Sequence, residues 1–134
     1  MIEPDNGGIR YSAGNPRFDL IPFDVLTELA QVYTMGAKKY GDEPGGARNW
    51  ERGTDWGECI RGTMSHLSSF CRGEDWNTED EGGRHHLDHA IWNLFALRAY
   101  TLRGIGTDDR NILKPGTCVP PEDIGGGSRV EVAQ

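Results

Sequence analysis

The sequence predicts an all-α fold, a helical bundle, and three observations lead to that prediction. Three stretches repeat apolar residues with the period of an α-helix, and none shows the alternation of a half-buried strand. Glycine is abundant, with 19 of 134 residues, and it gathers between these stretches. Hydrophobic residues make up 36% and charged residues 26%, as in a folded globular chain. We therefore expect one helical domain, residues 1–103, followed by an irregular Gly- and Pro-rich tail, residues 104–134, which Ile112, Leu113 and Val119 could anchor.

The first helix is predicted from Pro22 to about Lys39. Proline suits the first helical position, and Asp24 lies in the first turn, where a negative charge is favoured. Lys38 and Lys39 fall in the last turn, where positive charge is favoured. The face expected to be buried consists of Leu26, Leu29, Tyr33 and Ala37.

The second helix is predicted to begin at Asp55 and to end before Gly73. Glu58 follows Asp55 by three residues, the spacing of a capping box, in which each side chain would bond a free backbone N–H group. Its expected buried stripe consists of Ile60, Met64, Leu67 and Cys71. His66 lies at the border of this stripe, where it is either a core histidine or a candidate ligand.

The third helix is predicted from about His85 to Leu102 or Arg103, and it has two different faces. The expected core stripe consists of Leu87, Ala90, Ile91, Leu94 and Leu97. On another side, helical spacing gathers His86, His89, Asn93 and Tyr100. Two histidines one turn apart can present their imidazole nitrogens to one metal ion or one phosphate group. The alternatives are a solvated polar face, or a ligand pair made by His85 and Asp88.

An acidic loop, residues 73–84, precedes the third helix. Its carboxylates belong to Glu74, Asp75, Glu79, Asp80 and Glu81. Mg²⁺ and Mn²⁺ favour carboxylate oxygen, and Mn²⁺ also accepts imidazole, so the loop and the histidines could share an ion. The alternative is a loop whose charge serves only solubility.

The charge of the chain narrows its chemistry. The chain has 21 acidic and 14 basic residues and a net charge of −7, which argues against binding nucleic acid through its phosphate backbone. Divalent ions would let an acidic protein hold a phosphorylated substrate. The three cysteines lack a CxxC spacing, and the first residues lack the features of a signal peptide. With no apolar run long enough for a membrane span, we expect a cytoplasmic protein.

Five short motifs follow one another along the chain in a recognisable order. They are Asn15–Pro22, Gly36–Gly41, Asn49-Trp50, His66-Leu67 followed by Gly73-Glu74-Asp75 and Glu79, and His86–Ala90 with Asn93. This ordered set, which covers about residues 15–100, resembles the phage and bacterial dATP/dGTP diphosphohydrolase N-terminal family, a branch of the MazG-like all-α nucleotide pyrophosphohydrolases.

The resemblance implies a helical bundle, a homodimer or homotetramer, and on the order of two or three Mg²⁺ or Mn²⁺ ions. MazG-like enzymes carry ExxE and ExxD pairs of acids, whereas this chain has Glu58 to Arg61 and His86 to His89 at the corresponding places. Either histidines replace the acids or loop acids take their role. The candidate metal ligands are therefore His66, His86, His89, Glu74, Asp75 and Glu79.

The resemblance also implies hydrolysis of a purine deoxynucleoside triphosphate, with dGTP first and dGDP or GTP as alternatives, to the monophosphate in phage nucleotide metabolism. Glu79 and His89 are the candidate catalytic residues. The candidate substrate-binding residues are Arg17, Lys38, Lys39 and Arg61 for phosphate, and Asn49, Trp50 and Asn93 for base or sugar. One rival is an HD-type phosphohydrolase, although the order here is Asp88-His89 rather than His-Asp. The other is a helical adaptor without enzymatic activity.

Overall fold

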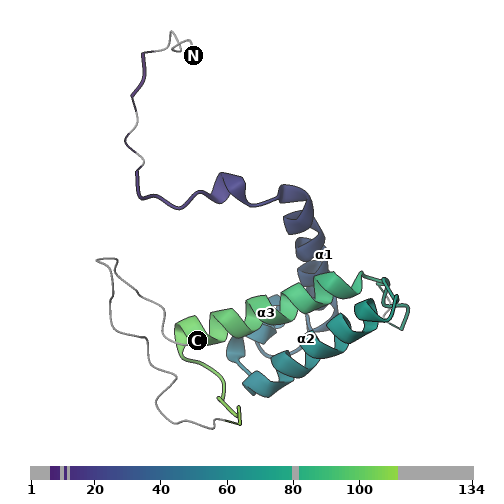
Figure 1. The fold of residues 1–134 in the computed structure, drawn as a ribbon. Coiled ribbons are helices and arrows are strands. Elements are labelled where there is room, and N and C mark those ends of the chain that lie inside the picture. The colour runs from purple at the N-terminus through teal and green to yellow at the C-terminus, as the bar shows by residue number, and fades with distance from the viewer. Residues whose placement is uncertain (1–6, 10, 12, 80–81, 112–134) are drawn as a thin grey trace.

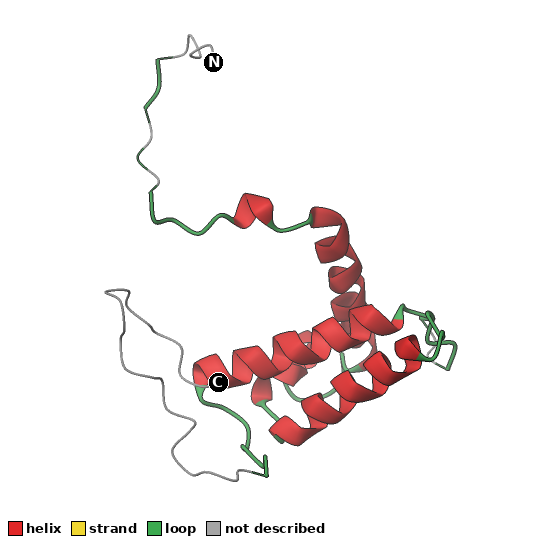
Figure 2. Ribbon diagram, in the orientation of Figure 1, coloured by secondary structure: helices red, strands yellow, loops and turns green. Residues whose placement is uncertain are grey.

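The computed structural model describes residues 7–9, 11, 13–79 and 82–111. The described residues form helices connected by loops and contain no strand (Figure 2), which confirms the all-α prediction. In chain order the elements are the 3-10 helix η1 (Phe18–Leu20), α1 (Phe23–Lys39), the 3-10 helix η2 (Gly46–Arg52), α2 (Trp56–Cys71) and α3 (His86–Arg103).

The centre of the fold is an antiparallel pair formed by α2 and α3, which make the most extensive contact of any two elements (Figure 1). The C-terminal half of α1 packs on α3, and η2 fills the space between α1 and α3. The N-terminal half of α1 projects beyond the pair (Figure 1), and Phe23 and Val25 are accordingly exposed. Leu26, predicted to be buried, is 38% exposed, whereas Leu29 one turn later is buried.

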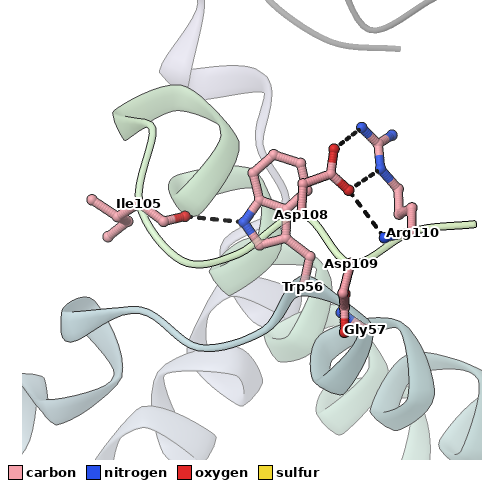
Figure 3. A network of polar contacts seen from close by, with 6 residues as sticks. All are labelled: Trp56, Gly57, Ile105, Asp108, Asp109 and Arg110. Atoms are coloured by element: carbon pink, nitrogen blue, oxygen red, sulfur yellow. Dashed lines mark hydrogen bonds and ion pairs between the residues drawn. The ribbon is translucent and has the colours of Figure 1, made fainter. Parts of the chain in front are cut away.

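The predicted capping box of α2 is wrong. The side chain of Asp55 makes no cap bond, and the carboxylate of Glu58 pairs with Arg61 on the surface. The side chain of Asp109 caps α2 instead: its Oδ1 accepts the N–H of Gly57 at 2.7 Å (Figure 3). A short-range pattern cannot reveal a cap that comes from a residue 52 positions away.

The segment after α3 is fastened to α2 by further contacts. The indole Nε1 of Trp56 donates to the carbonyl of Ile105 at 3.0 Å, and Arg110 lies over the same indole while it pairs with Asp108 (Figure 3). The first residues of the predicted tail thus pack on their own chain. The predicted anchors Ile112, Leu113 and Val119 lie outside the described residues.

The core is small. Its buried apolar residues are Leu29, Val32, Cys59, Ala90, Ala96 and Tyr100. Aromatic side chains surround the centre formed by Cys59, Ala96 and Tyr100, and they include Trp50, Trp56 and Trp92. No helix among the described residues is long and apolar enough to cross a membrane.

The predicted core face of α3 is partly wrong. Ala90 is buried and Leu97 packs on the core centre, but Leu94 is 51% exposed, whereas His86, His89 and Tyr100 are buried. The reason lies on the facing helix. A Cβ atom at Gly62 of α2 would lie 2.6 Å from Oδ1 of Asn93, so the helices approach closely where α3 presents polar side chains.

The predicted buried stripe of α2 is also wrong. Ile60, Met64 and Leu67 are 37%, 61% and 40% exposed, and Cys71 is exposed as well. Helical geometry turns this stripe to the same side of the antiparallel pair as Leu94, which is the side away from α1 and η2. We call Ile60, Met64, Leu67 and Leu94 the open apolar face.

Candidate active site

Three groups of polar and aromatic side chains surround the C-terminal half of α1 and the first turns of α3. The residues predicted from the sequence to carry chemistry are divided among these groups rather than gathered in one. Each group is built by different elements, so we describe each in turn and then the predicted residues that belong to none.

The first group lines a cavity of about 630 Å³ between α1 and the acidic loop. Lys38 and Lys39 come from the last turn of α1, and Glu79 and Arg84 come from the loop. The remaining lining residues, Gln31, Thr34, Met35 and Gly82, are mostly small or polar. We call this the charged cavity. Its volume is in the range of sites that hold a small-molecule ligand.

The charged cavity combines three cations with a carboxylate. Lys38, Lys39 and Arg84 could neutralise a polyphosphate, since ammonium groups attract phosphate as point charges and guanidinium can bind it with two donors. Glu79 is exposed to the same space and is available to accept a proton. Sequence reasoning proposed Lys38, Lys39 and Glu79 but missed Arg84. The nearby glycines, Gly82 and Gly83, could have drawn attention to it.

The second group is an aromatic pocket of about 240 Å³ on the other flank of α1. Tyr33, Trp50 and Trp92 form its walls, with ring centroids 5.8–6.2 Å apart and rings inclined at 55–70°. Asn49 also lines it, and its Nδ2 donates to the carbonyl of Pro44 at 2.7 Å. The other lining residues are Gly36, Tyr40, Ala47, Gly53, Thr54 and Tyr100.

Helical geometry explains why the two hollows are separate. At about 100° per residue, Thr34 and Lys38 project from α1 roughly opposite to Gly36 and Tyr40. Thr34 and Lys38 line the charged cavity, whereas Gly36 and Tyr40 line the aromatic pocket. The predicted phosphate-binding lysines and the predicted base-binding pair, Asn49 and Trp50, therefore lie on different flanks of one helix.

The third group is a histidine cluster between α2 and α3. The ring of His66 stacks on that of His89 with centroids 4.6 Å apart, and its Nδ1 lies 2.9 Å from Nδ1 of His86. His86 and His89 are 7% and 8% exposed, so the cluster is shielded from solvent. His85 of the alternative pair caps α3, where its Nδ1 accepts the N–H of Leu87 at 3.0 Å.

The predicted metal ligands do not form one ligand set. Glu74 lies on the surface, 3.6 Å from Arg72, and Glu79 lines the charged cavity rather than the histidine cluster. The carbonyl of Asp75 accepts the N–H of His86 at 2.8 Å, at the start of α3. In the described part of the chain, no group of three or more His, Cys, Asp or Glu side chains is arranged to hold a metal ion. The described residues therefore do not form the implied metal site by themselves.

Three predicted substrate-binding residues lie outside both hollows. Arg17 pairs with Asp19 in the exposed segment before α1, at 2.7 Å. Arg61 pairs with Glu58 on the outer surface of α2. Asn93 faces α2 and donates through Nδ2 to the carbonyl of His89 at 2.9 Å. In this arrangement Asn93 helps to fix the contact between the helices.

Local charges surround the rim of the aromatic pocket. Hydrogen bonds from Arg48 and then Arg103 lower the pKa of Glu51, so its carboxylate is ionised over a wide pH range. The guanidinium of Arg103 also lies 5.8 Å from the ring of Trp50. Burial raises the pKa of Tyr33, and it raises the pKa of Tyr100 to about 12. Both phenols are therefore neutral at physiological pH.

Comparison with known proteins identifies the family. No curated protein and no solved structure matches this chain. The model of one family, described as dATP/dGTP diphosphohydrolase, N-terminal, matches residues 5–110, which contain all the described helices and both hollows. Because the match covers most of the sequence, the chain belongs to the dATP/dGTP diphosphohydrolase N-terminal family.

Proposed function

We propose that this protein is a nucleotide pyrophosphohydrolase that converts a purine deoxynucleoside triphosphate, dGTP first, to the monophosphate and pyrophosphate. The family name is that of a diphosphohydrolase acting on purine deoxynucleotides. The observation that carries the proposal is the charged cavity, where Lys38, Lys39 and Arg84 share a space with Glu79. This combination suits a polyphosphate that has to be held and then attacked by water.

The proposed reaction uses these residues in distinct roles. The two lysines and Arg84 bind the phosphate groups and stabilise the negative charge that builds up on the leaving pyrophosphate. Glu79 accepts a proton from the water that attacks the α-phosphorus. The bond from that phosphorus to the bridging oxygen then breaks, and pyrophosphate leaves with the bond's electron pair.

A requirement for Mg²⁺ or Mn²⁺ is a separate proposal. Its support is the net charge of −7, since an acidic protein meets a polyanionic substrate more readily when divalent ions neutralise part of the charge. No step of the proposed reaction depends on a metal held by the histidine cluster.

The test is an assay of the common ribo- and deoxynucleoside triphosphates, each with Mg²⁺ and with Mn²⁺, followed by separation of the products. We expect dGMP and pyrophosphate from dGTP. Lys38→Met should raise KM by about tenfold, because it removes one charge that attracts the substrate. A matched change of an exposed cation outside the cavity lining, Arg98→Met on α3, should leave KM unchanged.

Two results would contradict the proposal. Release of intact triphosphate or of single phosphates would indicate the HD-type chemistry instead. A wild-type protein that hydrolyses none of the nucleotides would favour the adaptor alternative.

A further inference from the structure

The segment that leads into α1 exposes a dense group of apolar side chains. Residues 18–26 comprise η1, the short link after it and the first turn of α1, and we call them the apolar arm. Among the described elements, η1 contacts none of the others, so the arm begins without a helix of its own chain to pack on. The large apolar residues exposed in the arm are Phe18, Leu20, Ile21, Phe23, Val25 and Leu26.

The exposed side chains of the arm continue a face that is buried further along α1. Val25 and Leu26 precede Leu29 by four and three residues, which places all three on one side of the helix together with Val32. Leu29 and Val32 are 4% and 5% exposed, whereas Val25 and Leu26 are 44% and 38% exposed. The apolar stripe of α1 therefore extends beyond the part of the helix that the rest of the fold covers (Figure 1). A surface that continues a buried face is suited to a further partner.

A second unpartnered apolar surface in the described part of the chain is the open apolar face. Ile60, Met64 and Leu67 follow one another at helical spacing on α2, and Leu94 of α3 lies on the same side of the antiparallel pair. This side is turned away from α1, whereas the apolar arm projects from the start of α1 (Figure 1). The arm therefore does not cover the open apolar face of its own chain, and a monomer leaves both surfaces in water.

The area of the two surfaces decides between the possible pairings of two copies. With on the order of 100 Å² for each exposed side chain, the open apolar face presents about 400 Å² and the arm about 600 Å². A stable interface buries about 800 Å² on each partner. Pairing of face with face, or of arm with arm, supplies less than this and leaves the other surface exposed. Pairing of arm with face in both directions covers about 1,000 Å² on each copy.

We propose that two copies of this chain exchange their arms, so that the apolar arm of each copy packs on the open apolar face of the other. The two contacts are related by a two-fold axis, and the assembly therefore closes as a pair instead of growing into a filament. The family resemblance implies only that an oligomer forms, whereas this inference states which surfaces meet. It does not depend on the proposed hydrolysis.

The test is analytical sedimentation of the full chain with one variant of each surface. Val25→Asp places a charge on the arm, and Met64→Lys places the opposite charge on the open apolar face. Each variant should raise the dissociation constant of the pair by at least about tenfold, because each contact would then bury a charge without a partner. Both side chains are exposed in the single chain, and an acidic residue is favoured in the first turn of α1, so both variants should retain the helix content of the wild type.

An equal mixture of the two variants is the decisive measurement. In a mixed pair, the intact arm of the Met64→Lys chain meets the intact face of the Val25→Asp chain. In the second contact the new aspartate lies opposite the new lysine, so the two charges neutralise each other. We therefore expect the mixture to pair at a concentration at which each variant alone sediments near 14.9 kDa. Pairing of face with face, or of arm with arm, does not produce this rescue.

Two further variants complete the experiment. Thr27→Asp introduces a charge on the side of α1 opposite Val25 and should sediment as the wild type does. Leu20→Asp alters η1, where the side chain is 69% exposed, and it replaces Val25→Asp if that variant does not fold.

Four results would overturn the proposal. A wild type that sediments as a monomer would show that a second copy does not cover these surfaces. Arm variants that pair as tightly as the wild type would indicate pairing of face with face. A Met64→Lys variant that pairs as tightly as the wild type would indicate pairing of arm with arm. A mixture that pairs no more tightly than its components would show that the two surfaces do not meet.

Discussion

The two flanks of the C-terminal half of α1 differ in almost every chemical respect. One flank, with Lys38 and Thr34, faces a wide cavity lined by cations and a loop carboxylate. The other, with Tyr33 and Gly36, faces a narrow pocket walled by indole and phenol rings. The difference arises because successive helical residues point in different directions, so that one short stretch, Tyr33–Tyr40, supplies both environments.

This comparison shows how the recognition of charge and the recognition of a ring can be separated. Changes on the charged flank should alter the reaction rate and phosphate binding but leave contacts with a ring intact. Changes on the aromatic flank should weaken contacts with a ring but leave phosphate binding intact. A substitution that altered both to the same extent would mean that the flanks work as one site.

The largest effect is expected from removal of divalent ions. Dialysis against EDTA should reduce hydrolysis of dGTP to background, because the polyphosphate would then meet an acidic protein without neutralising ions. Hydrolysis that continues undiminished in EDTA would show that the cations of the charged cavity suffice.

The second effect is expected from Glu79→Gln. The amide cannot accept the proton from the attacking water, so we expect kcat to fall by about a hundredfold, within the range of 10²–10⁴ typical for general base catalysis. Glu58→Gln removes an exposed carboxylate on α2 and serves as the control, with kcat equal to that of the wild type. A similar loss of kcat in both variants would mean that the total charge of the protein, rather than the Glu79 carboxylate itself, causes the effect.

Much of the fold could be predicted from the sequence. The three long helices begin and end within about two residues of the predicted positions, because proline, glycine and acidic residues at their ends act locally. The assignment of buried and exposed faces was less successful. An amphipathic pattern shows that α3 has two faces, but the partner helix decides which face is buried, and α2 presents Gly62 and His66 to the histidine side.

Which candidate residues lie together could be predicted in part, for a similar reason. Lys38, Lys39 and Glu79 share a cavity, and Asn49 and Trp50 share a pocket, as residues near glycine-rich loops often do. α1 separates the charged cavity from the aromatic pocket, and this depends on which side of α1 each loop crosses. Local sequence patterns contain no information on the path of a loop in space. Tyr33 and Trp92 were missed because aromatic residues at helical spacing are more often core residues.

The third effect concerns the open apolar face, which lies on the opposite side of the α2–α3 pair from both hollows. We expect a second copy of the chain to cover it, because the described part of this 134-residue chain buries few apolar side chains and would gain stability by association. Met64→Asp should shift the sedimentation mass from an oligomer to 14.9 kDa at micromolar concentration. Ser65→Asp introduces the same charge one position away, on another face of α2, and should leave the oligomer intact. A wild type that sediments as a monomer would refute the expectation.

The smallest effect is expected at Tyr100, where the wall of the aromatic pocket meets the core. Its hydroxyl donates to the carbonyl of Trp50 at 2.5 Å, and that carbonyl also accepts the N–H of Gly53 at 3.2 Å, so Tyr100→Phe removes one of its two hydrogen bonds. We expect the free energy of unfolding to fall by about 0.5–1.5 kcal/mol at pH 7. Burial raises the pKa of Tyr100 from 10.0 to about 12, so as pH rises through this window the unfolded chain loses the phenolic proton first and the folded state loses stability. Phenylalanine does not titrate, and the stability difference between wild type and variant, measured by urea unfolding, should therefore be constant below pH 10 and narrow towards pH 12. A difference that stays constant up to pH 12 would show that the phenol is not shielded as the structure indicates.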